Sequence, residues 1–424
     1  MMRDVKILPS FLKGAIKIPP SKSLCHRAII AAALSQGQSI INNVVLSEDI
    51  LATINGVRAF GALVTVLQDK LIIEGGKLGA ENSCIIDCNE SGSTLRFLMP
   101  LGLLTNSSIS YVGKGNLGDR PLGPYIEIFR EQGILYSDCK LPITIHGILK
   151  PGIFRLKGNV SSQFITGLMF ALPLLEEDST IILTEPLESK GYIDLTIKVL
   201  KNFGVSISNH NYKSFSIKGK QEYIKTDYTV EGDYSQAAFW LAAGALGADI
   251  TCLGLKLHSK QSDKSMLDIL RNAGVILEST DTHVKVLPSR LKAFEVDVSE
   301  CPDLMPILTV LAALSEGESK ITGAARLRLK ECDRLKAIMT ELNKLGAQIV
   351  EEQDSLSIKG LKYLQGGDVE SWGDHRIAMA LAIAATKCIE PVIIHNSDAV
   401  HKSYPNFFDD YKLLGGILLE RNMG

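Results

Sequence analysis

Residues 91–112, with the sequence SGSTLRFLMPLGLLTNSSISYV, contain the pattern that determines the fold. Small polar residues at Ser91 and Ser93 are typical of a helix start. The apolar run Leu95–Leu104 predicts a helix that is buried on all sides. The run Ser108–Tyr111 then predicts a short strand. The same succession recurs about every 70 residues, which is the signature of an internal repeat.

Six copies of this pattern are present. The predicted buried helices are Arg27–Leu34, Leu95–Leu104, Phe164–Leu175, Ala237–Leu246, Leu304–Leu314 and Ile377–Ala385. The predicted strands are Ser39–Asn42, Ser108–Tyr111, Thr180–Leu183, Asp249–Cys252, Ser319–Ile321 and Val392–Ile394. An amphipathic helix follows in each copy and stops at a glycine. These glycines are Gly61, Gly133, Gly204, Gly274, Gly346 and Gly415.

Most copies end in a strand pair, such as Gln348–Val350 with Leu356–Lys359. A solenoid is the alternative arrangement, but its repeats usually span only about 20–45 residues. The longer copies here favour two compact α/β domains of three units each. A length of 424 residues fits two or three domains.

The composition excludes several classes of protein. The net charge is −2, so no global field attracts nucleic acid or an acidic membrane. Eight cysteines form no CxxC pair and no zinc-ligand spacing, which predicts free thiols in a reducing compartment. Met1–Phe11 lacks the apolar core of a signal peptide, and no apolar run reaches the roughly 18 residues that span a membrane. We therefore expect a cytoplasmic protein.

Each predicted buried helix opens on small polar or charged residues. The openings are Ser21-Lys22-Ser23, Ser91-Gly92-Ser93, Ser161-Ser162-Gln163, Asp233-Tyr234-Ser235, Pro302-Asp303 and Gly373-Asp374-His375. Helix N-termini present free N–H groups that suit phosphate or carboxylate. If the units pack about local threefold axes, several such ends converge on one anion site. Plain helix capping is the alternative.

Cations accompany these openings. Lys22 and Arg27 lie within two turns of one predicted helix and could bind a phosphate by charge-assisted hydrogen bonds. Gly92 permits a close approach of the backbone to a ligand, and Arg120 follows in a glycine-containing loop. Lys330 and Arg334 are four residues apart on a predicted helix, where like charges repel unless an anion offsets them. Solvated helix surfaces carry similar runs.

Two carboxylates lie among the cations of the second half. Asp303 and Glu331 could divide the roles of base and acid, although Asp303 also has the residue type of a plain N-cap. His375 is either a site residue or a structural histidine, and Lys402 alone resembles a surface lysine.

Together, these motifs resemble the EPSP (5-enolpyruvylshikimate-3-phosphate) synthase family from Leu8 to about Gly415. The markers are Ser21-Lys22-Ser23 with Arg27, Asn89–Arg96, Ser161-Ser162-Gln163, Lys330-Glu331-Cys332-Asp333-Arg334, Asp374-His375-Arg376 and Lys402-Ser403-Tyr404-Pro405.

The resemblance implies an α/β fold of two similar domains, each built from three repeated βαβαββ units as an inside-out α/β barrel. Residues 1–20 and 231–424 would form one discontinuous domain that carries the catalytic carboxylates. Residues 21–230 would form the second domain, which carries most contacts to shikimate 3-phosphate. The active site would lie in the cleft between the domains, which closes on the first substrate.

The resemblance further implies a metal- and cofactor-independent 3-phosphoshikimate 1-carboxyvinyltransferase of the shikimate pathway to chorismate and the aromatic amino acids, and a glyphosate target. The residues implied for shikimate 3-phosphate are Lys22, Ser23, Arg27, Ser161, Ser162, Gln163, Ser189, Tyr192, Asp303 and Lys330. Those implied for phosphoenolpyruvate are Lys22, Gly92, Arg120, Gln163, Arg334, Arg376 and Lys402. Asp303 would be the base, and Glu331, alone or with Lys22, would supply the proton. A monomer is expected.

Two positions depart from the family pattern. Arg326 stands where some members have Asn, and Asn89-Glu90-Ser91 precedes Gly92 in place of the common form, which affects the phosphoenolpyruvate pocket and its inhibitor response.

Two other functions remain open. The related UDP-N-acetylglucosamine enolpyruvyl transferase typically carries a reactive Cys where this chain has Gly115. A non-catalytic anion- or RNA-binding scaffold needs the cations but neither Asp303 nor Glu331, and the net charge disfavours it.

Overall fold

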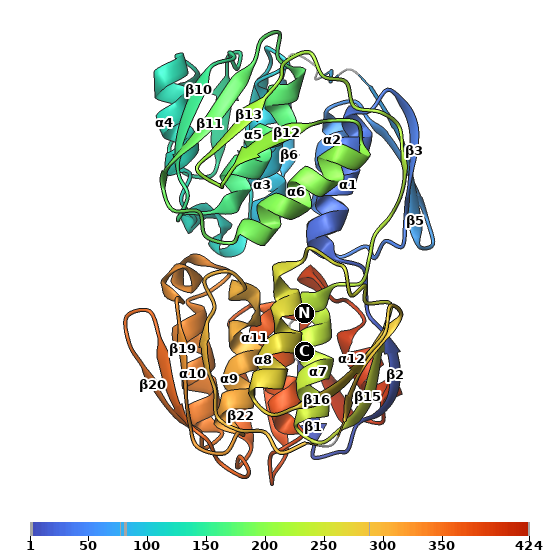
Figure 1. The fold of residues 1–424 in the computed structure, drawn as a ribbon, viewed down its shortest axis with the longest axis vertical. Coiled ribbons are helices and arrows are strands. Elements are labelled where there is room, and N and C mark those ends of the chain that lie inside the picture. Colours follow the sequence, from blue (N-terminus) through green and yellow to red (C-terminus); the bar gives the residue numbers. More distant parts are fainter. Residues whose placement is uncertain (1–2, 77, 80–82, 288, 423–424) are drawn as a thin grey trace. The chain divides into compact units, whose positions relative to one another are not determined.

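The computed structural model describes residues 3–76, 78–79, 83–287 and 289–422 of the chain (Figure 1). The chain forms two compact units. The first unit comprises the residues up to Ser21 and those from Glu231 onwards, and the second unit comprises Lys22–Val230. Ser21, expected in the second domain, belongs to the first unit, where its N–H donates to the Glu231 carbonyl at 2.8 Å. The two segments at which the chain changes units are therefore hydrogen-bonded to each other.

Each unit contains three four-stranded sheets of one topology, in which the first pair of strands is parallel and the others are antiparallel. The sheets of the second unit are, in spatial order, β14 (Asp227–Thr229), β3 (Gly37–Asn42), β5 (Lys70–Gly75), β4 (Leu63–Leu67); β6 (Ser83–Asp87), β7 (Ser108–Val112), β9 (Ile143–His146), β8 (Leu135–Tyr136); and β10 (Ile153–Lys157), β11 (Ser179–Glu185), β13 (Ser214–Ile217), β12 (Ile207–His210). Those of the first unit are β2 (Lys13–Lys17), β15 (Asp249–Leu253), β17 (His283–Leu287), β16 (Ile276–Ser279); β18 (Glu295–Asp297), β19 (Glu318–Thr322), β21 (Leu356–Lys359), β20 (Gln348–Glu351); and β22 (Gly367–Glu370), β23 (Val392–His395), β1 (Arg3–Leu8), β24 (Ile417–Asn422).

Each of the six repeats contributes two helices. The first helices are α1 (Lys22–Leu34), α3 (Gly92–Gly102), α5 (Ser162–Ala171), α7 (Tyr234–Ala245), α9 (Met305–Ala313) and α11 (His375–Ala385). The second helices are α2 (Glu48–Ala59), α4 (Gly123–Gln132), α6 (Lys190–Asn202), α8 (Met266–Asn272), α10 (Arg334–Lys344) and α12 (Phe407–Leu413). The predicted fold class, with six βαβαββ units, is confirmed. All six predicted stop glycines have a left-handed φ, between +69° at Gly133 and +94° at Gly61.

Three sheets are completed by strands that are distant in sequence. β14 pairs in parallel with β3, and β2 pairs in parallel with β15. β1 lies between β23 and β24 and takes the place of the last strand of that unit. In Figure 1 the dark blue strands β1 and β2 therefore lie among the yellow and red elements of the first unit.

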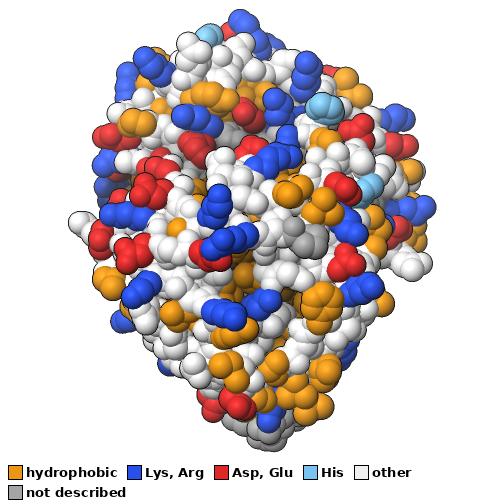
Figure 2. Space-filling model, turned by 60° about the horizontal axis from the view of Figure 1, so that its bottom comes forward, with side chains coloured by type: hydrophobic (Ala, Val, Ile, Leu, Met, Phe, Trp, Pro, Cys, Tyr) orange, Lys and Arg blue, Asp and Glu red, His pale blue; other side chains and the backbone are white. Residues whose placement is uncertain are grey.

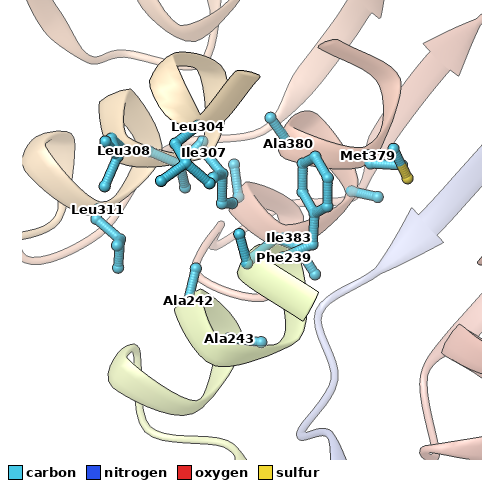
Figure 3. Packing of buried hydrophobic residues seen from close by; sticks show 14 of the residues in the cluster. Phe239, Ala242, Ala243, Leu304, Ile307, Leu308, Leu311, Met379, Ala380 and Ile383 are labelled. Atoms are coloured by element: carbon cyan, nitrogen blue, oxygen red, sulfur yellow. The ribbon is translucent and has the colours of Figure 1, made fainter. Parts of the chain in front are cut away.

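The first helices form the centre of each unit. Every residue of α7, α9 and α11 is buried, as expected for helices that are apolar on all sides. Figure 3 shows buried side chains of α7, α9 and α11 gathered in one cluster, among them Phe239, Ile307 and Ile383. Strands such as β7 and β17 alternate buried and partly exposed residues, so the sheets cover the helices with one face and present the other to solvent. None of the helices in the described ranges combines the length and hydropathy needed to cross a membrane.

Candidate active site

The first turns of the central helices contact one another in the second unit. Gln163 of α5 donates from Nε2 to Ser93 Oγ of α3 at 3.0 Å. Thr94 of α3 donates from Oγ1 to the Asp49 carbonyl at 3.5 Å, and the Asp49 carboxylate is the partner of Lys22 at the start of α1. The N-termini of α1, α3 and α5 therefore meet, as the convergence hypothesis requires. We name the residues predicted around them the Lys22 cluster: Lys22, Ser23, Arg27, Gly92, Arg120, Ser161, Ser162, Gln163, Ser189 and Tyr192.

Lys22 is held by a carboxylate that sequence reasoning missed. Its Nζ donates to Asp49 Oδ2 at 2.6 Å, with the Lys22 and Asp49 side chains 18% and 12% exposed. Asp49 lies in the first turn of α2, 27 residues from Lys22. Because no local pattern links positions this far apart, the pair could not be predicted from the sequence.

Arg27, one turn further along α1 than Lys22, is almost fully buried. It donates from Nε to Thr196 Oγ1 at 2.8 Å, from Nη1 to the Ser23 carbonyl at 2.7 Å and from Nη2 to the Tyr192 carbonyl at 3.2 Å. Desolvation lowers the pKa of Arg27 to about 10, so it stays protonated at neutral pH. Three predicted residues, Ser23, Arg27 and Tyr192, are thereby joined.

The predicted serines lie at two other helix starts. Ser161 is the N-cap of α5 and accepts from the Gln163 N–H at 3.3 Å. Ser189 precedes α6 with a φ of +59° and is buried. A buried non-glycine residue in the left-handed region is strained, and such strain gathers at functional sites.

Gly92 lies where three polar groups meet. A Cβ at this position would stand 2.9 Å from Arg120 Nη1, 3.2 Å from Arg96 Nη1 and 3.4 Å from Gln163 Oε1. Gly92 is the first residue of α3 and is not left-handed. Gly92 therefore does not supply a left-handed backbone angle, and its missing Cβ leaves space beside Arg120 and Gln163.

Arg96 belongs to this arrangement, although it stood in a marker motif without a role. Its Nη1 donates to Gln163 Oε1 at 2.6 Å and its Nη2 donates to the Pro121 carbonyl at 3.3 Å. The guanidinium also lies 4.9 Å from the centre of the Phe164 ring. Arg96 thus orients Gln163 and contacts the chain next to Arg120.

The first unit carries a second group, here named the Asp303 cluster: Asp303, Lys330, Glu331, Arg334, Arg376 and Lys402. Asp303 lies in the 3-10 turn η4 (Pro302–Leu304), and the N-cap position of α9 falls on Leu304. Its Oδ1 accepts from Arg334 Nη1 at 2.9 Å and its Oδ2 from Arg376 Nη2 at 2.8 Å. The alternative that Asp303 is only a helix cap is therefore wrong.

Arg334 links the carboxylates of this cluster. Besides Asp303, it donates from Nη2 to Glu331 Oε2 at 2.7 Å and from Nε to Asp374 Oδ2 at 2.7 Å. The Arg334 side chain is only 1% exposed. Burial alone would lower its pKa, but Asp374, Glu331 and Asp303 raise that pKa well above its usual value. Arg334 is thus a permanent cation that holds the two predicted catalytic carboxylates.

Charge also sets the protonation of Asp303 and Lys330. Desolvation raises the pKa of Asp303, but Arg376, Lys330 and Arg334 outweigh it and hold that pKa well below its usual range. Desolvation lowers the pKa of Lys330 to about 8, with Arg334 and Arg326 acting in the same direction.

Lys330 does not lie on a helix with Arg334, contrary to the sequence prediction. It follows the 3-10 turn η5 (Ala325–Leu329), and α10 begins only at Arg334. The loop nevertheless brings Lys330 Nζ to 4.0 Å from Asp303 Oδ1, so both cations serve one carboxylate.

Helix starts also meet in the first unit. Arg376 in the first turn of α11 donates from Nη2 to Ser235 Oγ of α7 at 3.0 Å and to Asp303 before α9. Lys402 ends the 3-10 turn η6 (Ser397–Lys402), is buried, and donates to the Gly373 carbonyl at 2.7 Å. Arg326, left outside the predicted site, donates to the Ser299 carbonyl at 2.7 Å.

The two clusters suit anionic ligands and acid–base chemistry. Each combines several cations with helix N-termini, and the Asp303 cluster adds two carboxylates on one arginine. Basic and acidic side chains are interspersed over the face drawn in Figure 2. An anion would therefore be attracted by the cations of a cluster and not by a uniformly basic face. Within the described part of the chain, no three His, Cys, Asp or Glu residues are arranged to hold a metal ion.

Comparison with known proteins identifies close relatives. The family model of EPSP synthase (3-phosphoshikimate 1-carboxyvinyltransferase) matches residues 8–411. A Clostridium perfringens protein named 3-phosphoshikimate 1-carboxyvinyltransferase is 56% identical over 421 residues, covering 98% of this chain and 99% of that protein. A Clostridium novyi protein of the same name is 52% identical, with both chains fully covered.

Solved structures share the fold. EPSP synthase from Acinetobacter baumannii superposes with a TM-score of 0.84 at 25% identity, covering 99% of this chain and 100% of that one. The enolpyruvyl transferase NikO from Streptomyces tendae gives a TM-score of 0.81 with both chains fully covered. Its 16% identity makes it a likeness of fold alone.

Proposed function

Because this chain belongs to the EPSP synthase family, we propose that it transfers the enolpyruvyl (1-carboxyvinyl) group of phosphoenolpyruvate to the 5-hydroxyl of shikimate 3-phosphate. The products are 5-enolpyruvylshikimate 3-phosphate and inorganic phosphate. The observation that carries the chemistry is the pairing of Asp303 and Glu331 with one buried cation, Arg334. A reaction that needs one base and one acid beside bound anions matches this arrangement.

We propose that the Lys22 cluster binds mainly shikimate 3-phosphate. Arg27 and Lys22 would face the phosphate, since a guanidinium and an ammonium bind it by charge-assisted hydrogen bonds. The hydroxyls of Ser23, Ser161, Ser162 and Ser189, with Gln163 and Tyr192, would hold the remaining polar groups.

Phosphoenolpyruvate would bind to cations of both clusters. These are Lys22 and Arg120 with Gly92 and Gln163, and Arg334, Arg376 and Lys402. Since the clusters belong to different units, the proposal requires the units to close on one pair of substrates. The cations of one chain suffice for this inventory, so we propose that a monomer is active.

Asp303 would remove the proton of the 5-hydroxyl, whose oxygen adds to C2 of phosphoenolpyruvate. Glu331, with Lys22, would protonate the methylene carbon, which gives a tetrahedral ketal. Loss of phosphate and of a proton from the methyl group then yields the enol ether. Anionic substrate at Arg334 and Arg376 would offset the charges that now hold Asp303 ionised, and so raise its pKa toward that of a useful base.

We propose that the protein works in the cytoplasm, which is a reducing compartment. Its eight cysteines are free thiols, which supports a location such as the cytoplasm.

A phosphate-release assay with two acceptors tests the proposal. Phosphoenolpyruvate should release phosphate with shikimate 3-phosphate, and not with UDP-N-acetylglucosamine. Turnover with the UDP-sugar alone would assign the chain to the related transferase, and turnover with neither acceptor would reject transfer.

A further inference from the structure

We propose that Glu341, a residue without a role in the mechanism above, positions the cations Lys402 and Arg376 by fixing the turn at residues 370–374. It would be a positioning residue, because it acts through this turn and not on a substrate. The inference rests on the proposed function, which assigns both cations to phosphoenolpyruvate.

Glu341 is a buried carboxylate in α10, with 1% of its side chain exposed. Its Oε1 accepts from Trp372 Nε1 at 2.7 Å, and its Oε2 accepts from the Glu370 N–H at 2.9 Å. Lys344 Nζ lies 2.9 and 2.8 Å from the two oxygens. Burying a carboxylate is costly unless it is fully paired, so these donors explain how the charge is tolerated within the fold.

The turn that Glu341 holds is strained. Trp372 has a φ of +56° and Gly373 follows with +64°. A left-handed conformation is unfavourable for a bulky residue such as Trp and persists only where surrounding contacts fix it. The bonds from Glu341 to the Trp372 indole and to the Glu370 N–H lie on either side of Ser371 and supply such contacts.

The same turn carries groups of the Asp303 cluster. The Gly373 carbonyl accepts from Lys402 Nζ at 2.7 Å. The next residue, Asp374, accepts from the Arg376 N–H at 2.8 Å and from Arg334 Nε at 2.7 Å. A change in the backbone at Trp372 would therefore move the partner of Lys402 and the start of α11 together.

Kinetics of Glu341→Gln test the proposal. The amide keeps one acceptor oxygen, so the bond to Trp372 or to Glu370 is lost, and the KM for phosphoenolpyruvate should rise about tenfold. The KM for shikimate 3-phosphate should change less than about twofold, since the Lys22 cluster supplies most of its contacts. Lys344→Gln is the matched control: it removes the charge of the half-exposed Lys344, keeps an amide donor near Glu341, and leaves the bonds to Trp372 and Glu370 in place. It should change each KM by less than about twofold, even if the loss of the ion pair lowers the melting temperature.

Trp372→Phe gives a second route if Glu341→Gln folds poorly. It keeps an aromatic ring and removes only the indole N–H, and it should raise the same KM selectively. Combined with Glu341→Gln it should raise this KM by less than the product of the two single effects, because both variants act on the contact between Glu341 and the 370–374 turn. Wild-type enzyme in the same assay separates the two proposals: absence of turnover there rejects the proposed function. An active wild type with unchanged KM values, or with equal rises for both substrates in both variants, overturns the role of Glu341.

Discussion

At the scale of single residues, the Asp303 carboxylate is both the proposed base and the ion-pair partner of two arginines. It is ion-paired to Arg334 and Arg376, which are two of the cations assigned to phosphoenolpyruvate. Its basicity is therefore suppressed by the groups that the second substrate would engage. This coupling would delay proton removal until both substrates are bound.

Gly92→Ala should alter ligand binding without harming the fold. Ala suits a helix start that has ordinary backbone angles, but its Cβ would press on Arg120 Nη1 at 2.9 Å. A shift of about 1 Å in a binding group costs up to about 10²-fold. The KM for phosphoenolpyruvate should rise, and the inhibition constant of the longer molecule glyphosate should rise more, while affinity for shikimate 3-phosphate stays near that of the wild type.

The melting temperature separates this outcome from a structural one. It should match or slightly exceed the wild-type value, since Ala favours helix over Gly by about 1 kcal/mol. A lower melting temperature with equal loss of both ligands would contradict the role of Gly92 as space for a ligand.

Lys330 predicts a pH dependence. Its pKa of about 8 means that its charge is lost as the pH rises above that value. If the charge binds shikimate 3-phosphate, kcat/KM for this substrate should fall above pH of about 8, because kcat/KM reports ionisations of the free enzyme. Lys330→Arg, which stays charged, should move the fall to higher pH. Identical pH profiles would remove Lys330 from the binding site.

At the scale of elements, the regular features were predictable from sequence. Apolar runs such as Ile377–Ala385 have a single favourable environment, the centre of a unit. The Lys330 region was predicted wrongly because spacing alone does not reveal that α10 begins at Arg334, after a loop that ends in the N-cap Asp333. The interpretation of Asp303 as a plain N-cap was wrong for a related reason: the cap position of α9 falls on Leu304, and Arg334 and Arg376 hold the Asp303 carboxylate.

Two stop glycines give a matched test of the repeat. Gly133 and Gly204 end α4 and α6 with φ of +69° and +83°. A Cβ at Gly133 would meet no described atom within 4 Å, whereas one at Gly204 would lie 2.7 Å from Ile224 Cδ1. Gly133→Ala should lower the free energy of unfolding by about 1 kcal/mol, and Gly204→Ala by more.

Urea unfolding measures the two free energies, and kcat should remain unchanged in both variants. Equal stability of both variants and the wild type would show that these glycines are not needed as helix stops.

At the scale of the whole molecule, long-range partners set the limit of prediction. Nothing in the sequence near β3 or β15 indicates that β14 and β2 complete their sheets, because strand pairing across the chain leaves no local pattern. The partners Asp49 and Glu341 were missed for the same reason. In the sequence, Asp49 and Glu341 look like ordinary acidic residues of amphipathic helices. Their roles depend on the side chains that the fold brings next to them.

The assignment of substrate contacts to both units predicts a change in compactness. Saturating shikimate 3-phosphate should reduce the radius of gyration measured by small-angle X-ray scattering. Arg27→Ala should abolish this response at the same ligand concentration, because it loses a charge-assisted contact to the phosphate. An unchanged radius for wild type at saturation would contradict closure.

The central claim is that carboxylate and ammonium from different units act on one reaction. Its most direct measurement is ³¹P NMR of phosphoenolpyruvate mixed with shikimate 3-phosphate and wild type, Lys22→Met or Asp303→Asn. The wild type should convert phosphoenolpyruvate into inorganic phosphate and a new phosphate ester in equal amounts. Each variant should remain folded and lose about 10²-fold or more in kcat, as expected for acid–base groups. A wild-type rate in either variant would contradict the account.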